Sequence, residues 1–115
     1  MKLYSYSSCS TCRRAISWLK NNDITFELVD ILKKPPSKVM LISASELYGD
    51  RKYLLNTSGT IYRSIGSNVL RKLSDEDLFE KLFMEPRLIK RPFLHKTNKC
   101  SLVGFKEEKW AEKLL

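Results

Sequence analysis

The sequence predicts an α/β fold in which a mixed four-stranded sheet is flanked by helices and carries an inserted helical segment. The first third of the chain reads as strand, helix and strand, and such a crossover unit pairs its strands in parallel. Near the C-terminus two apolar runs flank a turn-prone segment, as in an antiparallel hairpin. A chain of 115 residues has the length of one compact unit, so we expect residues 1–115 to form a single domain.

The crossover unit occupies the first 32 residues. Residues 2–7 (KLYSYS) mix Leu3 with aromatic and polar residues at short range, which is typical of a strand. A helix follows, closed by KNND, because apolar residues then recur at helical spacing at Cys12, Ala15, Ile16 and Leu19. Residues 24–32 (ITFELVDIL) predict a second, mostly buried strand. Two prolines end that strand, and a helix is expected over roughly residues 37–48, ended by Gly49.

The rest of the chain predicts helices and then the hairpin. Residues 50–73 are less regular and indicate a short helix, a polar turn at residues 56–59 and another helical turn. Ser74 and Asp77 form a capping box, and the helix they open has an apolar stripe of Leu78, Phe79, Leu82 and Phe83. The hairpin turns at KTNK, and KEEKWAEKLL predicts a closing helix. This order of elements is that of a thioredoxin-like domain with helices inserted between its two halves.

The composition indicates a soluble globular protein, and its basic charge fits either a solvated basic surface or an anionic partner. Apolar residues make up 43% and charged residues 30% of the chain. No signal-peptide pattern is present, and no window has the roughly 18 to 20 apolar residues that cross a bilayer, so we expect a cytoplasmic protein without membrane contact. The formal charge of +8 favours an anionic partner. Because lysine and arginine are spread along the chain and no recognition motif accompanies them, we expect no direct binding to nucleic acid. We also expect a monomer, since nothing in the sequence indicates a larger assembly.

Cys9 and Cys12 lie at the junction between the first strand and the first helix. Free backbone N–H groups and the helix dipole favour an anion there, and Arg13 and Arg14 add positive charge one turn away. Because the thiolate is the nucleophilic form of cysteine, this position favours a reactive Cys9. Cys12, three residues on, is placed to resolve an adduct on Cys9 as a disulfide. The same helix end is suited to an oxyanion such as arsenate or phosphate.

Other roles for the two cysteines stay open at the level of the sequence. They could be small core residues at the start of a buried helix. They could also share a zinc ion with His95 and Cys100, although we expect no metal site. Three cysteines in a reducing cytosol disfavour a structural disulfide framework. We interpret His95 as an exposed strand residue and Cys100 as an exposed or edge-strand thiol.

Four segments carry a family resemblance through their order and spacing: YSSCSTCRRAISWLKNN, LLNTSGTIYR, LIKRPFL and VGF. Together they resemble the ArsC-type arsenate reductase family and, within it, the branch that includes the Spx and MgsR redox regulators and the YffB-like proteins. The resemblance runs from Lys2 to about Leu114. It implies a thioredoxin-like fold with an inserted helical segment, no bound cofactor, and glutathione or a glutaredoxin as reductant.

The resemblance also implies roles for particular residues. Cys9 matches the cysteine that attacks arsenate in glutaredoxin-dependent enzymes, where glutathione then attacks the adduct and glutaredoxin completes the reduction. Arg91 matches an arginine that holds the oxyanion or the thiolate, and it precedes a residue that matches a cis-proline. The predicted catalytic set is Cys9, Cys12 and Arg91. The predicted oxyanion- or thiol-binding set is Ser8, Ser10, Thr11, Arg13, Asn56, Arg63 and Pro92.

The chain departs from the arsenate reductases at two positions. Asn56 and Gly104 stand at or next to the places where those enzymes carry a second and a third oxyanion-binding arginine. Each lost bidentate arginine removes about 1.5 to 3 kcal/mol of charge-assisted hydrogen bonding. Arg63 and Arg13 are candidates to compensate. The absence of these two arginines therefore disfavours efficient arsenate reduction.

Two functions follow from the resemblance. The first is a thiol-disulfide oxidoreductase of the arsenate reductase type, in which Cys9 attacks, Cys12 resolves and Arg91 positions an anion. The second is a regulator in which the two cysteines form a redox switch, as in the Spx branch. Spx-like regulators bind the C-terminal domain of the RNA polymerase alpha subunit, and Gly49 and Arg91 lie at or near the positions that matter for this contact.

Overall fold

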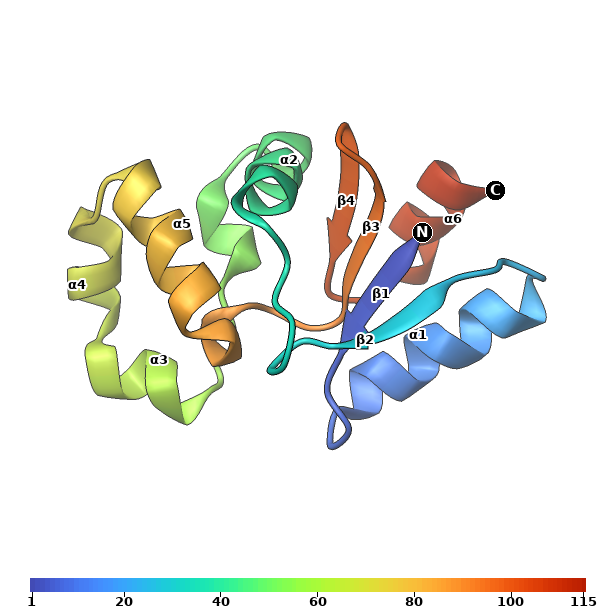
Figure 1. Cartoon of the computed structure of the whole chain (residues 1–115), viewed down its shortest axis with the longest axis horizontal. Helices are drawn as coiled ribbons and strands as arrows, with labels where there is room; N and C mark the ends of the chain where they lie inside the picture. The colour runs from blue at the N-terminus through green and yellow to red at the C-terminus, as the bar shows by residue number, and fades with distance from the viewer.

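A computed structural model describes all 115 residues and shows a mixed four-stranded sheet at the centre of the molecule (Figure 1). The strands are β1 (Lys2–Ser5), β2 (Glu27–Asp30), β3 (Phe93–Thr97) and β4 (Cys100–Val103). Their order is β2-β1-β3-β4. Strand β1 pairs with β2 in parallel and with β3 antiparallel, and β3 and β4 form the antiparallel hairpin. The predicted fold class is confirmed.

Helix α1 (Ser10–Asn21) connects the two parallel strands. Its apolar side, which includes the buried residues Cys12, Ala15 and Leu19, faces the sheet. The helix begins at Ser10, immediately after the capping residue Cys9, which is earlier than the apolar spacing alone indicates. Both cysteines therefore belong to the first turn.

The second strand differs from its prediction. A mostly buried strand over residues 24–32 was expected, but β2 has four residues, and only Val29 among them is buried. Leu28 is 57% exposed. Strand β2 lies at the edge of the sheet, where no strand covers its outer side, so its apolar composition does not lead to burial.

The inserted segment contains most of the helices. Its elements are α2 (Lys38–Tyr48), η1 (Arg51–Leu54), α3 (Thr60–Ile65), α4 (Ser67–Lys72), α5 (Asp75–Met84) and η2 (Pro86–Leu88). Gly49 ends α2 with φ of 81°, a left-handed conformation that glycine adopts without steric cost. The sequence predicted one helical turn after residue 59, whereas Gly66, with φ of 96°, separates two short helices there. The residues of the predicted stripe in α5 are buried except Phe83, which is 38% exposed.

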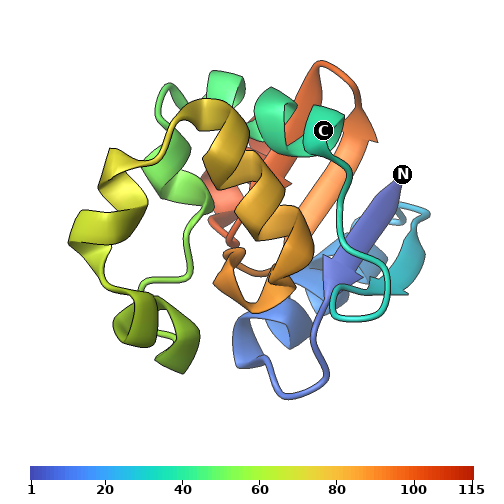
Figure 2. The ribbon, with the colours of Figure 1, turned by 60° about the vertical axis from the view of Figure 1, so that its left-hand side comes forward.

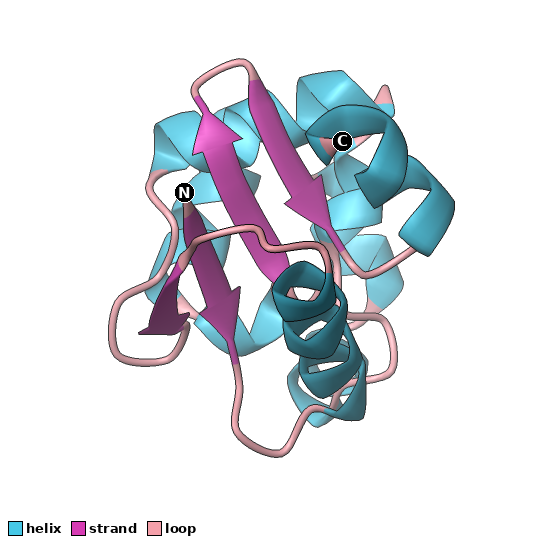
Figure 3. Ribbon diagram, turned by 90° about the vertical axis from the view of Figure 1, so that its right-hand side faces the viewer, coloured by secondary structure: helices cyan, strands magenta, loops and turns pink.

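Alternate residues of the strands face two hydrophobic cores. On β1, Leu3 packs with α1 and with Trp110 of α6 (Glu107–Leu114), while Tyr4 packs with the inserted helices. Helices α1 and α6 thus cover one face of the sheet and the insertion covers the other, as Figures 1 and 2 show. The four strands lie between these helical layers in Figure 3. None of the helices combines the length and the apolar character needed to cross a membrane.

Candidate functional site

The Cys9 sulfur lies at the N-terminus of α1. The chain turns between β1 and α1, with the Cys9 N–H donating to the Tyr6 carbonyl at 3.1 Å. Cys9 has extended backbone angles, and its Sγ accepts a 3.1 Å hydrogen bond from the backbone N–H of Cys12. Cys9 is thus the N-cap of the helix. Its sulfur faces a helix end, where a negative charge is stabilised.

Cys12 lies in a very different environment from Cys9, although the two side chains are neighbours. The Cys12 side chain is buried, and Cys9 is half-buried. Burial, and next the hydrogen bond to Cys9, raises the pKa of Cys12 to about 12, while the positive charge of Arg91 acts in the opposite direction. Cys12 therefore holds its proton at neutral pH and can donate it toward Cys9.

Arg91 lies just before β3, next to the two cysteines. It forms a cis peptide bond with Pro92, as the resemblance implied, and Pro92 is buried. The guanidinium carbon of Arg91 is 5.0 Å from the centre of the Tyr6 ring, which is close enough for a cation–π contact. The Nε atom of Arg91 is buried and has no hydrogen-bond partner in the protein. A buried donor without a partner favours the binding of an anion at this place.

A pocket of about 570 Å³ opens beside Cys9. Five residues that the sequence analysis discussed line it: Cys9, Thr11, Asn56, Arg91 and Gly104. Four cationic side chains, those of Lys90, Arg91, Lys106 and Lys109, also line it, and no carboxylate does. A positively charged, partly enclosed space next to a cysteine attracts anionic reactants.

The two positions that lack an expected arginine differ in what fills them. Asn56 stays at the pocket, and its side-chain amide donates a 3.4 Å hydrogen bond to the Arg87 carbonyl. Gly104 has φ of 63°, and a Cβ atom placed on it would lie 2.9 Å from Cε of Lys90. The Lys90 side chain therefore occupies the space above Gly104. The Lys90 side chain thus lies beside Gly104, at or next to the place where the resemblance implies an arginine.

Several predicted residues do not line this pocket. Ser8, Ser10 and Arg13 are exposed around the start of α1, and Arg13 donates to the Ser7 carbonyl at 3.3 Å. Arg63 is exposed on α3. The structure thus leaves Arg13 and Arg63, the two candidates to replace missing arginines, outside the pocket that Arg91 lines.

Sequence reasoning missed the pocket lysines and two tyrosines, Tyr48 and Tyr53. Lys90 directly precedes Arg91 in the IKRP segment, and Lys106 and Lys109 follow Gly104 at helical spacing. These were the available signals. Lys109 Nζ lies 4.5 Å from the centre of the Tyr48 ring, so the aromatic side chain helps to place this cation.

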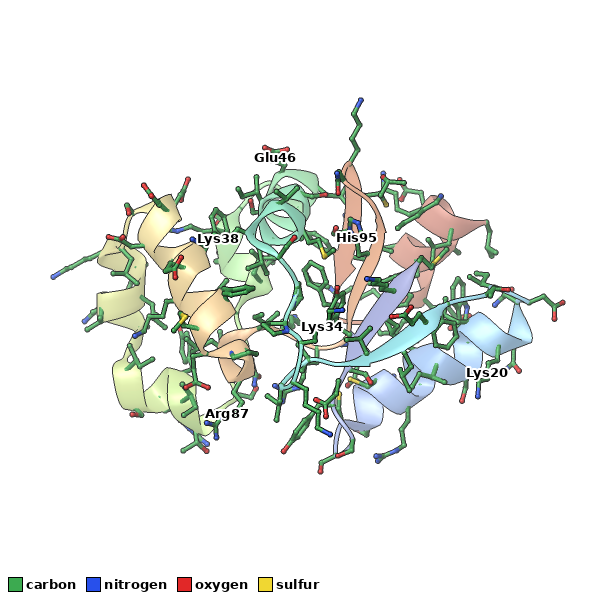
Figure 4. All side chains as sticks on the ribbon, viewed as in Figure 1. Lys20, Lys34, Lys38, Glu46, Arg87 and His95 are labelled. Carbon is green, nitrogen blue, oxygen red and sulfur yellow. The ribbon has the colours of Figure 1, made fainter.

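The residues of the alternative zinc site do not gather. No group of three or more histidine, cysteine, aspartate or glutamate side chains is arranged to hold a metal ion. His95 lies on β3, away from the start of α1 (Figure 4). Its Nδ1 is 3.1 Å from Ser101 Oγ. Burial and then nearby positive charge lower the pKa of His95. Cys100 begins the edge strand β4, as expected, and is half-buried.

Comparison with known proteins places this geometry in a family. A model of the ArsC family matches residues 4–113, which is nearly the whole chain. The chain belongs to the ArsC family. This ArsC-family protein is 36% identical over 114 residues to the uncharacterized protein YusI of Bacillus subtilis, with 97% of this chain and 96% of YusI covered.

Two further similar proteins have different descriptions, one as a regulator and one as a possible enzyme. The global transcriptional regulator Spx of Streptococcus mutans is 27% identical over 107 residues, with 92% of this chain and 77% of Spx covered. A crystal structure of a possible arsenate reductase from Streptococcus mutans superposes with a TM-score of 0.85 at 34% identity, with 96% of each chain covered. The ArsC-family protein is therefore similar both to a regulator and to a protein described as an enzyme.

Proposed function

We propose that this ArsC-family protein is a thiol-disulfide oxidoreductase in which Cys9 is the nucleophile. The observation that carries the proposal is the position of Cys9 Sγ, which lies at a helix N-terminus and lines a pocket with four cations and no carboxylate. The thiolate is the nucleophilic form of cysteine, and both features suit a negative charge at this place. Arg91, with its unpartnered buried Nε, is the group that positions an anionic reactant or the thiolate.

The reaction at Cys9 is an exchange between a thiolate and a disulfide. The Cys9 thiolate attacks one sulfur of the substrate, a new S–S bond forms, and the other half of the substrate leaves as a thiolate that takes a proton from solvent. Cys12 can then attack Cys9 in the mixed disulfide, passing its proton to the departing thiolate and leaving a Cys9–Cys12 disulfide. Glutathione or a glutaredoxin supplies the two electrons that restore both thiols.

The high pKa of Cys12 sets the balance between two ways of completing the cycle. Burial, the largest cause of the raised pKa of Cys12, also disfavours its thiolate in the mixed disulfide, so its attack on the adduct is slowed. An external thiol can attack the same mixed disulfide at Cys9 directly. The buried and protonated state of Cys12 therefore supports a cycle in which glutathione competes with Cys12 for the adduct.

Arsenate is a second substrate class to consider for the same site. Arg91 and the backbone N–H groups at the start of α1 are suited to an oxyanion. Asn56 can offer one neutral hydrogen bond where an arginine would offer a charged pair, and Gly104 offers no side chain. This arrangement supports thiol exchange more strongly than arsenate reduction.

A regulatory function is the alternative. Relatives named as the regulators Spx and MgsR match more than nine-tenths of this chain. Cys9 and Cys12 are neighbours, as a disulfide switch requires. In this version oxidation of the pair alters binding to the C-terminal domain of the RNA polymerase alpha subunit, with Gly49 at the end of α2 and Arg91 at the contact.

The enzyme proposal is tested by following the thiol state of the protein by mass spectrometry. The reduced protein is mixed with oxidised glutathione, and Cys9→Ser, Cys12→Ser and Cys100→Ser are compared with the parent. We expect no adduct in Cys9→Ser, a persistent adduct in Cys12→Ser, and parent behaviour in Cys100→Ser. Adduct formation at Cys100 alone would contradict the proposal. In a parallel assay of arsenate reduction coupled to glutathione and glutaredoxin, activity that survives in Cys9→Ser would exclude arsenate chemistry at this site.

The regulatory alternative needs a binding measurement instead. The oxidised and reduced proteins are passed over immobilised alpha C-terminal domain, with Cys9→Ser as the form that cannot close the disulfide. A difference in affinity between the two redox states supports the switch. Absence of binding in both states removes this alternative and leaves the enzyme proposal in place.

A further inference from the structure

A second cavity, of about 540 Å³, lies within the inserted segment among η1, α3, α4 and α5. It shares Tyr53 and Lys90 with the Cys9 pocket, so these two side chains border both cavities. Its apolar wall is formed by Tyr53, Leu55, Tyr62, Leu70 and Leu78. A second space of similar size therefore lies beside the Cys9 pocket.

Some charged groups around the second cavity are held by partners within the protein, and Lys90 is in no ion pair. The Arg51 guanidinium is held by the Asp75 carboxylate at 2.7 Å and by the carbonyl of Leu73 at 2.6 Å, so it has a structural role. The carboxylate of Asp50 accepts the backbone N–H of Lys52 at 2.8 Å. Lys90 takes part in no ion pair. It is the uncommitted cation that both cavities share.

Lys90 is fixed at the junction through its backbone and through Gly104. Its N–H donates a 2.7 Å hydrogen bond to the Leu54 carbonyl, which ties it to η1. Its Cε and Nζ atoms lie 2.9 and 3.7 Å from the position that a Cβ on residue 104 would take. The side chain thus passes over the glycine, which lines the Cys9 pocket. Any larger residue at position 104 would displace it.

We propose that the two cavities form one binding site for a low-molecular-weight disulfide that carries a negative charge and, beyond that charge, a flat apolar group. Cys9 meets the reacting sulfur, Lys90 binds the negative charge, and the Tyr53 ring contacts the apolar group. The inference rests on the proposed function, because the step at Cys9 is the thiolate–disulfide exchange described above. An inorganic oxyanion would use the first cavity alone.

Charge and shape of the substrate can be tested separately with three disulfide probes. The probe 5,5′-dithiobis(2-nitrobenzoate) is aromatic and anionic, 2,2′-dithiodipyridine is aromatic and neutral, and hydroxyethyl disulfide is neutral and has no ring. Their second-order rate constants with Cys9 are measured in a Cys12→Ser/Cys100→Ser background, in which Cys9 is the single thiol. Each variant is compared with this background for the same probe, which cancels the intrinsic reactivity of the probes.

Lys90→Met is expected to slow the anionic probe by about fivefold and to change the neutral aromatic probe by less than about twofold, since it removes one charge contact. This loss should shrink as salt is added. Tyr53→Ala is expected to slow both aromatic probes and to leave hydroxyethyl disulfide unchanged. Lys99→Met, in the exposed hairpin turn at the far end of β3, is the charge-matched control and should change nothing. Thermal unfolding midpoints verify that every variant is folded.

The outcomes separate this inference from the proposed function. Equal effects of Lys90→Met on the anionic and the neutral aromatic probe, or an equal effect of Lys99→Met, would overturn the charge assignment. A Tyr53→Ala variant that slows hydroxyethyl disulfide as much as the aromatic probes would overturn the extended site. If Cys9 reacts with none of the three probes, the proposed function fails, and this inference fails with it.

Discussion

The backbone N–H of Cys12 donates a 3.1 Å hydrogen bond to the sulfur of Cys9, so the proposed nucleophile is also the N-cap of α1. The same short segment therefore stabilises the helix end and holds Cys9 at the pocket. A negative charge on Cys9 strengthens the cap, since charge-assisted hydrogen bonds are stronger than neutral ones. Stability and reactivity are linked at this residue.

The capping role of Cys9 predicts different stabilities for two simple variants. Cys9→Ala should have a free energy of unfolding about 1 kcal/mol lower than Cys9→Ser, because alanine cannot accept the N–H of Cys12 whereas serine can. Urea unfolding followed by circular dichroism measures the difference. Both variants lack the thiol, so the comparison is free of the reactivity of Cys9. Equal stabilities would show that the sulfur contact does not hold the helix end.

The raised pKa of the buried Cys12 thiol predicts that the folded protein loses stability at high pH. Its pKa is raised from 9.0 to about 12 in the folded protein, chiefly by burial, so folding favours the protonated form. This contribution is fully present below pH 9.0 and is lost as the pH rises through about 12. Cys12→Ala should therefore lose less stability than the parent between these values. Urea midpoints measured across this pH range provide the test, and parallel curves for the two proteins would contradict it.

Arg91 predicts a charge preference in the alkylation of Cys9. In Arg91→Met the rate with iodoacetate should fall about tenfold or more relative to the rate with iodoacetamide, because a charged hydrogen bond is worth about 1.5 to 3 kcal/mol. The two reagents differ mainly in the charge of the group near the reacting carbon. Arg63→Met, on the exposed side of α3 and outside the pocket, is the matched control. A similar change in this control would assign the effect to net charge alone.

Tyr48 predicts a stability difference between two tyrosines that line the same pocket. Its hydroxyl donates to the Val103 carbonyl and accepts the Val103 N–H, each at 3.0 Å, and so completes the outer edge of β4. Tyr48→Phe leaves both backbone groups without this partner and should lower the free energy of unfolding by about 1 to 3 kcal/mol. Tyr53→Phe, whose hydroxyl makes no hydrogen bond within the protein, is the control. Thermal and urea unfolding of the two variants measure the contrast.

Local patterns were sufficient for the order of elements and for the position of Cys9. Helical spacing after Cys12, the turn at KTNK and the cap at Ser74 each depend on residues close in the chain, and the structure has an element at each of these places. The failures have a common cause. The burial of β2 and the exposure of Phe83 depend on what packs against them, and apolar composition does not contain this information.

The sequence by itself determined the fold class, the family resemblance and the pair of cysteines at the start of α1, because these follow from local spacing and from motif order. The tertiary structure decided which charges meet Cys9. Lys90, Lys106 and Lys109 join Arg91 at the pocket, while Arg13 and Arg63 stay outside it. The physical reason is that side chains distant in sequence become neighbours only when β3, β4 and α6 pack beside the first helix, and a glycine at position 104 leaves the space that Lys90 fills.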